Sequence, residues 1–138
     1  MIDIENYVIT QLNNAYSGVA TVSSVFVEEP ESFPWVYARQ ISNAAVKRYS
    51  DDRLHAHAVN ITIRIECYSA LTSGAKQEVK NLLQIGDECM QNMKFTCTAS
   101  NIIPNYDRSV TRGYADYTAM VWEPQEIDGN TVYQMYRR

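Results

Sequence analysis

The chain has 138 residues, of which 16 are acidic and 12 are basic, and its formal net charge is −4 with a pI of about 5.1. This length fits one domain, because a domain of this size buries roughly two-thirds of its unfolded surface and so has an independent core. The acidic balance argues against a nucleic-acid-binding domain, which normally presents a basic face to the phosphates.

The composition modestly favours a protein that contacts other proteins. Ten tyrosines stand against three phenylalanines, and tyrosine favours places where one edge is apolar and the other is wet, including interfaces. The cysteines Cys67, Cys89 and Cys97 are widely spaced with no CxxC pair, which indicates reduced, buried thiols in a protein made in the cytoplasm. The N-terminus is acidic and no apolar run reaches membrane-spanning length, so we expect a soluble protein with no membrane contact and no export signal.

A helix is predicted at the N-terminus, with Asp3 as its cap and Gly18 where a C-cap would fall. Its apolar residues recur at helical spacing: Ile4, Val8, Leu12 and Ala15. Residues 19–27, rich in β-branched side chains, predict a strand, and the prolines and glutamates of residues 28–34 interrupt it. Residues 35–41 predict a second strand, whose two sides are Trp35, Tyr37 and Arg39, and Val36, Ala38 and Gln40.

A long exposed loop is predicted at about residues 42–57, because no period is sustained there and charge is concentrated. The charged and titratable residues are Lys47, Arg48, Asp51, Asp52, Arg53, His55 and His57. Loops of this length in compact domains are usually functional or mobile. We therefore expect this loop to be an arm that reaches a partner.

The strongest period-two pattern follows. Val59, Ile61, Ile63, Ile65 and Cys67 alternate with Asn60, Thr62, Arg64, Glu66 and Tyr68, which predicts a strand with one buried face. A helix comes next, with Thr72 or Ser73 as its cap. Its apolar stripe is formed by Ala75, Val79, Leu82, Leu83, Gly86, Met90 and Met93.

The central feature of the prediction is a long antiparallel hairpin at residues 94–123. Ala115, Tyr117, Ala119 and Val121 share one side of its second strand, and Tyr114, Asp116, Thr118, Met120 and Trp122 share the other. The second side is mixed and carries large groups, which favours a half-covered sheet whose outer face meets another subunit. Asp128-Gly129 predicts a tight turn in a short C-terminal hairpin.

The order α-β-β-β-α-β-β predicts a single α+β domain over residues 1–138, with a mostly antiparallel sheet and two helices packed on one face.

The sequence gives little support to any candidate metal, acid/base or nucleophile site. His55 and His57 converge only on a strand and have no third ligand at a characteristic spacing, and Asp51-Asp52 is more typical of a solvated turn than of an acid/base pair. Cys67 on a strand more often packs than attacks, and no GxSxG, P-loop or Rossmann glycine pattern occurs. We expect no catalytic, metal or cofactor site, and no enzymatic activity.

Arg112-Gly113-Tyr114-Ala115 matches the opening of the RNA-recognition strand motif, whose aromatic residues stack on bases. The match then fails, because Asp116 and Ala119 occupy aromatic positions and a carboxylate would repel RNA. A sheet strand with a glycine bulge is the favoured interpretation.

The chain opens with a short helix, a Trp-containing strand and a polar loop that contains Tyr49, Ser50, Asp51 and Asp52. An alternating strand, an amphipathic helix at residues 73–93 and a hairpin follow. In that hairpin the matching positions are Phe95, Ile103-Pro104-Asn105-Tyr106-Asp107 and residues 112–117. Over most of its length this layout resembles the tail-terminator, or tail-completion, proteins of long-tailed bacteriophages.

The resemblance implies a structural virion protein, made in the host cytoplasm, that forms a hexameric ring on the head-proximal end of the tail tube. There it would end tube polymerisation and join the tail to the head. The implied partners are further copies of the chain, the tail tube protein and the head–tail connector protein, while DNA passes through the lumen without specific binding.

Charged residues in loops and at strand starts can pair with a neighbour's side chains, so we expect some of them at subunit or connector contacts. These are Arg48, Asp51, Asp52, Arg53, Arg108 and Arg112. Two alternatives remain open: another neck or tail-tube subunit of a phage or phage-like particle, and a small-molecule-binding domain with a pocket between the 73–93 helix and the sheet. For the second, the sequence offers no group of residues that would form a site.

Overall fold

The structure, a computed structural model, describes residues 4–25, 33–45, 58–71, 73–103, 110–122, 125–132 and 134–136. Its elements, in chain order, are α1 (Glu5–Ala15), β1 (Thr21–Ser23), β2 (Trp35–Ala45), β3 (Ala58–Ser69), α2 (Ala75–Asn92), β4 (Thr96–Ile103), β5 (Thr111–Trp122), β6 (Gln125–Ile127), β7 (Asn130–Val132) and β8 (Met135–Tyr136). The predicted α+β class and the order α-β-β-β-α-β-β are confirmed, with additional short strands.

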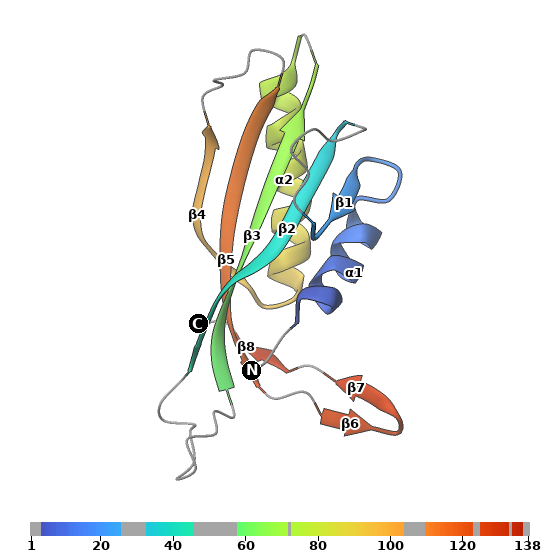
Figure 1. The fold of residues 1–138 in the computed structure, drawn as a ribbon, viewed down its shortest axis with the longest axis vertical. Coiled ribbons are helices and arrows are strands. Elements are labelled where there is room, and N and C mark those ends of the chain that lie inside the picture. Colours follow the sequence, from blue (N-terminus) through green and yellow to red (C-terminus); the bar gives the residue numbers. More distant parts are fainter. Residues whose placement is uncertain are drawn as a thin grey trace.

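The main sheet has six strands, in the order β1-β2-β3-β5-β4, and β8 pairs with β5. All pairs are antiparallel except β1 with β2. Both helices lie on one face of this sheet, and β6 and β7 form a separate two-stranded hairpin (Figure 1). The fold therefore has one layer of helices and one layer of sheet, with the core between them.

The central pair of strands fixes the two faces of the sheet. β3 and β5 run side by side in unbroken register from Ala58 opposite Trp122 to Ser69 opposite Thr111. The odd-numbered residues of both strands face the helices and are buried, except the half-buried Thr111 at the start of β5, which confirms the predicted alternation. Because side chains alternate along a strand, the even-numbered residues lie on the opposite face.

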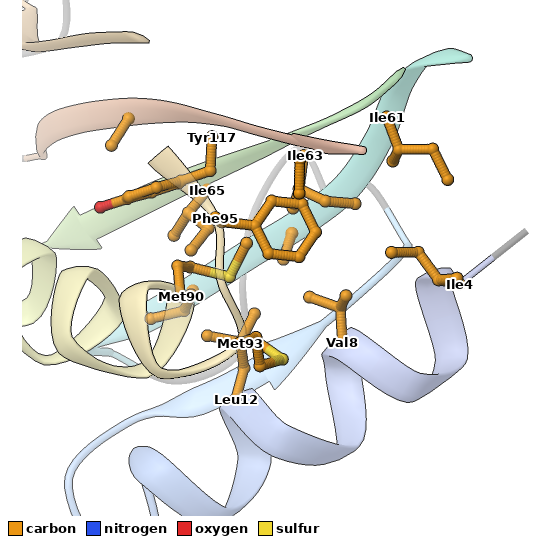
Figure 2. Close-up of a cluster of buried hydrophobic side chains, with 14 of the residues drawn as sticks. Ile4, Val8, Leu12, Ile61, Ile63, Ile65, Met90, Met93, Phe95 and Tyr117 are labelled. Atoms are coloured by element: carbon orange, nitrogen blue, oxygen red, sulfur yellow. The ribbon is translucent and has the colours of Figure 1, made fainter. Parts of the chain in front are cut away.

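The core joins both helices to the central strands (Figure 2). Val8 and Leu12 of α1 and Ile4 just before it are buried, as predicted, but Ala15 is exposed and Tyr16, just after the helix, takes the next inward position. In α2 the predicted stripe is buried at Val79, Leu82, Gly86, Met90 and Met93. Phe95, immediately after α2, is also fully buried against this cluster.

Gly113 is not at a bulge, contrary to the expectation from the sequence. It pairs in regular register with Cys67 of β3 and Ile102 of β4. A Cβ at this position would lie 2.6 Å from Val79 Cγ1 and 3.2 Å from Leu83 Cδ1. The glycine is needed because α2 packs closely over β5 at this point.

Several element boundaries differ from those predicted. β2 continues to Ala45, into the region predicted as loop, and its register shifts between Gln40 and Ser42, opposite β3. This bulge reverses the alternation, so the period that marks residues 35–41 as strand is lost beyond it. Of the strand predicted at residues 19–27, the described residues 19–25 form strand at Thr21–Ser23 alone, and residues 26 and 27 lie outside the described residues.

The cap of α2 differs from the predicted one, whereas the C-terminal turn agrees with its prediction. α2 begins after Gly74, which has a left-handed conformation and gives no side-chain cap, so Ser73 does not hold the predicted N-cap position, and Thr72 lies outside the described residues. Asp3 lies outside the described residues. Asp128 and Gly129 both have positive φ and join β6 to β7, which confirms the predicted tight turn.

Candidate interaction surface on the open face of the sheet

The face of the sheet opposite the helices is the most distinctive surface of the described chain. In Figure 1 the sheet lies in front of α2, and no described helix or strand covers that face. We call it the open face. Its residues in the three central strands are Trp35, Tyr37, Arg39, Thr62, Arg64, Glu66, Tyr68, Arg112, Tyr114, Asp116 and Thr118.

An ion pair lies at the centre of the open face. Arg64 and Asp116 are opposite one another in the β3–β5 register, and Arg64 donates from Nε to Oδ1 at 2.8 Å and from Nη2 to Oδ2 at 3.0 Å. The guanidinium also lies over the ring of Tyr114, 5.2 Å from its centroid. The hydrogen bonds to Asp116 raise the pKa of Arg64 further. Two-point hydrogen bonding and stacking together hold this side chain in one orientation.

A second polar group adjoins the first. The Tyr68 hydroxyl donates a 2.9 Å hydrogen bond to Glu66 Oε2, and Arg112 lies opposite Tyr68 on β5. Burial and the Glu66 carboxylate raise the pKa of Tyr68 to about 12, although Arg112 acts in the opposite direction. Towards the other end of the face, the Thr62 and Thr118 hydroxyls are 3.1 Å apart.

Arg39 is the exception on this face. It is exposed, lies over the Tyr37 ring at 5.6 Å from its centroid, and stands directly opposite Arg64 in the β2–β3 register. Like charges on opposite residues of neighbouring strands are unfavourable. Within the described ranges the ion pair on this face joins Arg64 to Asp116, and Arg39 has no carboxylate at ion-pairing distance. A carboxylate supplied from outside would therefore be bound favourably beside Arg39.

Of the six charged residues predicted at contacts, the structure places only Arg112, half-buried on the open face at the start of β5. Arg48, Asp51, Asp52, Arg53 and Arg108 lie outside the described residues, as do His55, His57 and most of the predicted 42–57 loop. Arg39 and Arg64 were not predicted as contact residues. Trp35, Tyr37 and Arg39 share one side of a strand in the sequence, but the neighbour opposite Arg39 depends on register.

The strand that resembles an RNA-binding motif does not form a stacking platform. Tyr114 is on the open face, Tyr117 is buried towards the helices, and Asp116 is bonded to Arg64. Base stacking requires neighbouring aromatic rings on one exposed face. The expectation that this strand is structural is therefore supported by the placement of its side chains.

The described residues offer little room for a small molecule. Between α2 and the sheet, the space is filled by side chains such as Met90, Phe95 and Tyr117 (Figure 2). A hollow beside α1, lined by Glu5, Val8, Ile9, Ala38, Arg39 and Ile63, has about 120 Å³ of empty space even when open solvent is included. Ligand pockets typically have roughly 300–1,000 Å³.

No group of three or more metal-ligating side chains occurs among the residues whose positions are described. A search of the same residues finds no helix that is long and apolar enough to cross a membrane. The chain matches no protein-family model, and no curated protein sequence is significantly similar to it.

Proposed function

We propose that the protein is a structural virion subunit that forms a ring on the head-proximal end of a phage tail tube, ends tube polymerisation and joins the tail to the head connector. The observation that carries this proposal is the open face, a sheet surface that no described helix or strand covers, with ordered aromatic and charged side chains and an exposed Arg39 that has no carboxylate partner within the described ranges. Such a face is suited to contact between protein subunits rather than to catalysis.

The aromatic residues of the open face supply contact area. Trp35, Tyr68 and Tyr114 are already half-buried among their neighbours. Tyr68 is hydrogen-bonded to Glu66, and Tyr114 is stacked beneath Arg64. Because these side chains are ordered before a partner arrives, binding costs less conformational entropy. This pre-ordering favours a protein partner with a broad surface.

Arg39 indicates the charge of that partner. Covering a guanidinium without a counter-charge is costly, so a surface that buries Arg39 has to bring an acidic group. The chain itself has a net charge of −4, so a second copy can supply one. A net acidic subunit is also compatible with a ring through which DNA passes without sticking.

The test of the proposal is the mass of the purified protein by light scattering across a concentration series, followed by negative-stain imaging. We expect closed rings, because a homo-oligomer with head-to-tail contacts closes when its rotation allows. Open-ended tubes would instead favour a tail-tube subunit. A monomer at every concentration would contradict the proposal.

The open face is tested by Arg39→Glu, with Lys80→Glu as the matched control. Lys80 is exposed on α2, on the other side of the molecule, and its reversal changes the net charge equally. We expect Arg39→Glu to weaken assembly at least tenfold, since the reversed charge would repel the partner's acidic group and leave it without a counter-charge. Equal assembly of both variants would exclude the open face from the contact.

A further inference from the structure

The main sheet ends in two edges with unusual composition. One edge is β1, and the other is β4, followed along β5 by the two-residue β8. Residues 96–101 of β4 are all exposed. Within the described ranges nothing pairs with the outer side of β4, which lies at the margin of the sheet in Figure 1. An edge strand of this kind presents unpaired backbone N–H and C=O groups.

The charged residues of this sheet lie on its inner strands, where they do not protect its edges against pairing with another strand. The inner strands carry Arg39, Arg64, Glu66, Arg112 and Asp116, whereas β4 (TCTASNII), β1 (TVS) and β8 (MY) carry no charged residue and no proline. Natural sheets discourage edge pairing with lysine, proline, inward-pointing charge, bulges or very short edge strands. β4 has eight residues and neither charge nor proline, so apart from its one bulge it lacks these devices and can pair with another chain.

One irregularity limits the region of β4 that can pair. The β4–β5 register shifts between Cys97 and Ala99, and the Thr98 hydroxyl donates to the Asp116 carbonyl oxygen at 3.3 Å. Beyond this bulge, Ala99 to Ile103 pair regularly with Asp116 to Arg112. The outer side of this regular segment is a template for a further strand.

We propose that β4 of one copy pairs with β1 of the next, so that the main sheet continues from subunit to subunit. This inference rests on the proposed ring and specifies its contact. The occupant is a second copy because the chain carries two uncharged edges at opposite ends of one sheet. Head-to-tail pairing uses both edges in every copy, and closure of the ring then leaves no edge unpaired.

The strand directions agree with this arrangement. β2 is antiparallel to β3, β3 to β5 and β5 to β4, while β1 is parallel to β2. When successive copies keep the same strand direction, β1 of the next copy runs antiparallel to β4. Antiparallel pairing is the slightly more stable of the two patterns.

Cysteine cross-linking tests the contact directly. Ala99 on β4 and Thr21 and Ser23 on β1 lie on the open side of the sheet, and the proposed contact is the register that sets Ala99 opposite Thr21 or Ser23, on the regular segment of β4. Ala99→Cys is combined with Thr21→Cys or Ser23→Cys in a background that carries Cys89→Ser and Cys97→Ser, which leaves only the buried Cys67. Adjacent strands place Cα atoms about 4.5–5.5 Å apart, within the range of a disulfide.

We expect oxidation to give a ladder of covalent multimers only when both edges carry a cysteine. Covalent dimers from Ala99→Cys alone would instead show β4 paired with β4 about a two-fold axis, and would overturn the head-to-tail contact. Multimers in solution that give no cross-link at either β1 position would overturn the proposed edge pairing but not the proposed ring. A protein that is monomeric throughout would overturn the ring as well.

A blocking substitution gives an independent readout. Ser100→Lys places a charge on β4, and Gln84→Lys places the same charge on the exposed side of α2. We expect Ser100→Lys to weaken assembly at least tenfold and Gln84→Lys to leave it unchanged, with both variants folded by circular dichroism. Equal assembly of the two variants would overturn the contact.

Discussion

The hydroxyl of Tyr16 lies against Gly86 in the core: a Cβ at Gly86 would be 2.6 Å from Tyr16 Oη. The same hydroxyl donates a hydrogen bond to the Leu82 carbonyl oxygen, and the Tyr16 side chain is fully buried. Burial raises the pKa of Tyr16, so the hydroxyl stays protonated and continues to donate. The loop after α1 is thus fixed to the middle of α2 by one tyrosine.

Gly86→Ala should therefore destabilise the fold, by about 1–3 kcal/mol, because the new methyl group displaces a buried and hydrogen-bonded ring. Tyr16→Phe alone should cost about 1 kcal/mol for the lost hydrogen bond. In the double variant the oxygen at 2.6 Å is gone, and the next nearest atoms to the methyl group are Ile65 Cδ1 at 3.4 Å and the ring Cζ of residue 16 at 3.7 Å. There we expect Gly86→Ala to cost much less, since alanine is the better helix former. Urea unfolding of all four proteins measures the coupling, and additive effects would contradict this account.

Gly113→Ala should also destabilise the fold by about 1–3 kcal/mol. The methyl group would meet Val79 Cγ1 at 2.6 Å, and Val79 is fully buried, so α2 would have to move away from β5. Val79→Ala removes this clash, and in that background the cost of Gly113→Ala should fall. Thermal unfolding measures each free energy. If the cost is the same in both backgrounds, close packing is not the reason for this glycine.

Asp116→Asn should lower the free energy of unfolding by about 1 kcal/mol, because Arg64 loses its charged partner while both side chains remain partly accessible to water. The side chains of Arg64 and Asp116 are 33% and 14% exposed. Glu88→Gln on the exposed side of α2 is the control, with an expected change within about 0.5 kcal/mol. Equal stability of the two variants in urea would mean that the ion pair orients the Arg64 side chain but does not stabilise the fold.

Alkaline pH should destabilise the protein. Burial, opposed by the neighbouring Tyr16 hydroxyl, raises the pKa of Cys67 from 9.0 to about 12, and burial with the Glu66 hydrogen bond raises that of Tyr68 from 10.0 to about 12. Both groups keep their protons to higher pH in the folded state than in the unfolded state. Their contribution to the stability of the fold is therefore complete below pH 9 and is lost as the pH rises to about 12. Urea midpoints across this range should fall. A constant midpoint would contradict the burial of these groups.

Arg112→Glu should weaken assembly while leaving the monomer folded. The new carboxylate would face Glu66 and Tyr68 on the open face, where it would repel an acidic partner surface. Light scattering measures assembly, and circular dichroism checks the fold. Normal assembly of the folded variant would remove Arg112 from the contact, as the same result would for Arg53→Glu.

The sequence by itself determined the faces of the elements. Alternation in residues 59–67 and 115–121 predicted the buried sides of β3 and β5, and helical spacing predicted the stripe of α2. Asp128-Gly129 predicted its turn because both residues tolerate positive φ. These signals are local: a side chain's direction follows from its position along its own helix or strand.

Only the tertiary structure decided which side chains meet. The register of β2 against β3 places Arg39 opposite Arg64, and the bulge at Gln40/Ser42 lets β2 run on to Ala45. Gly113 looked like a bulge in the sequence but provides room for Val79. Periodicity gives the direction of a side chain but not the neighbour across the sheet, because that neighbour is set by strand register and by how closely a helix packs over the strands.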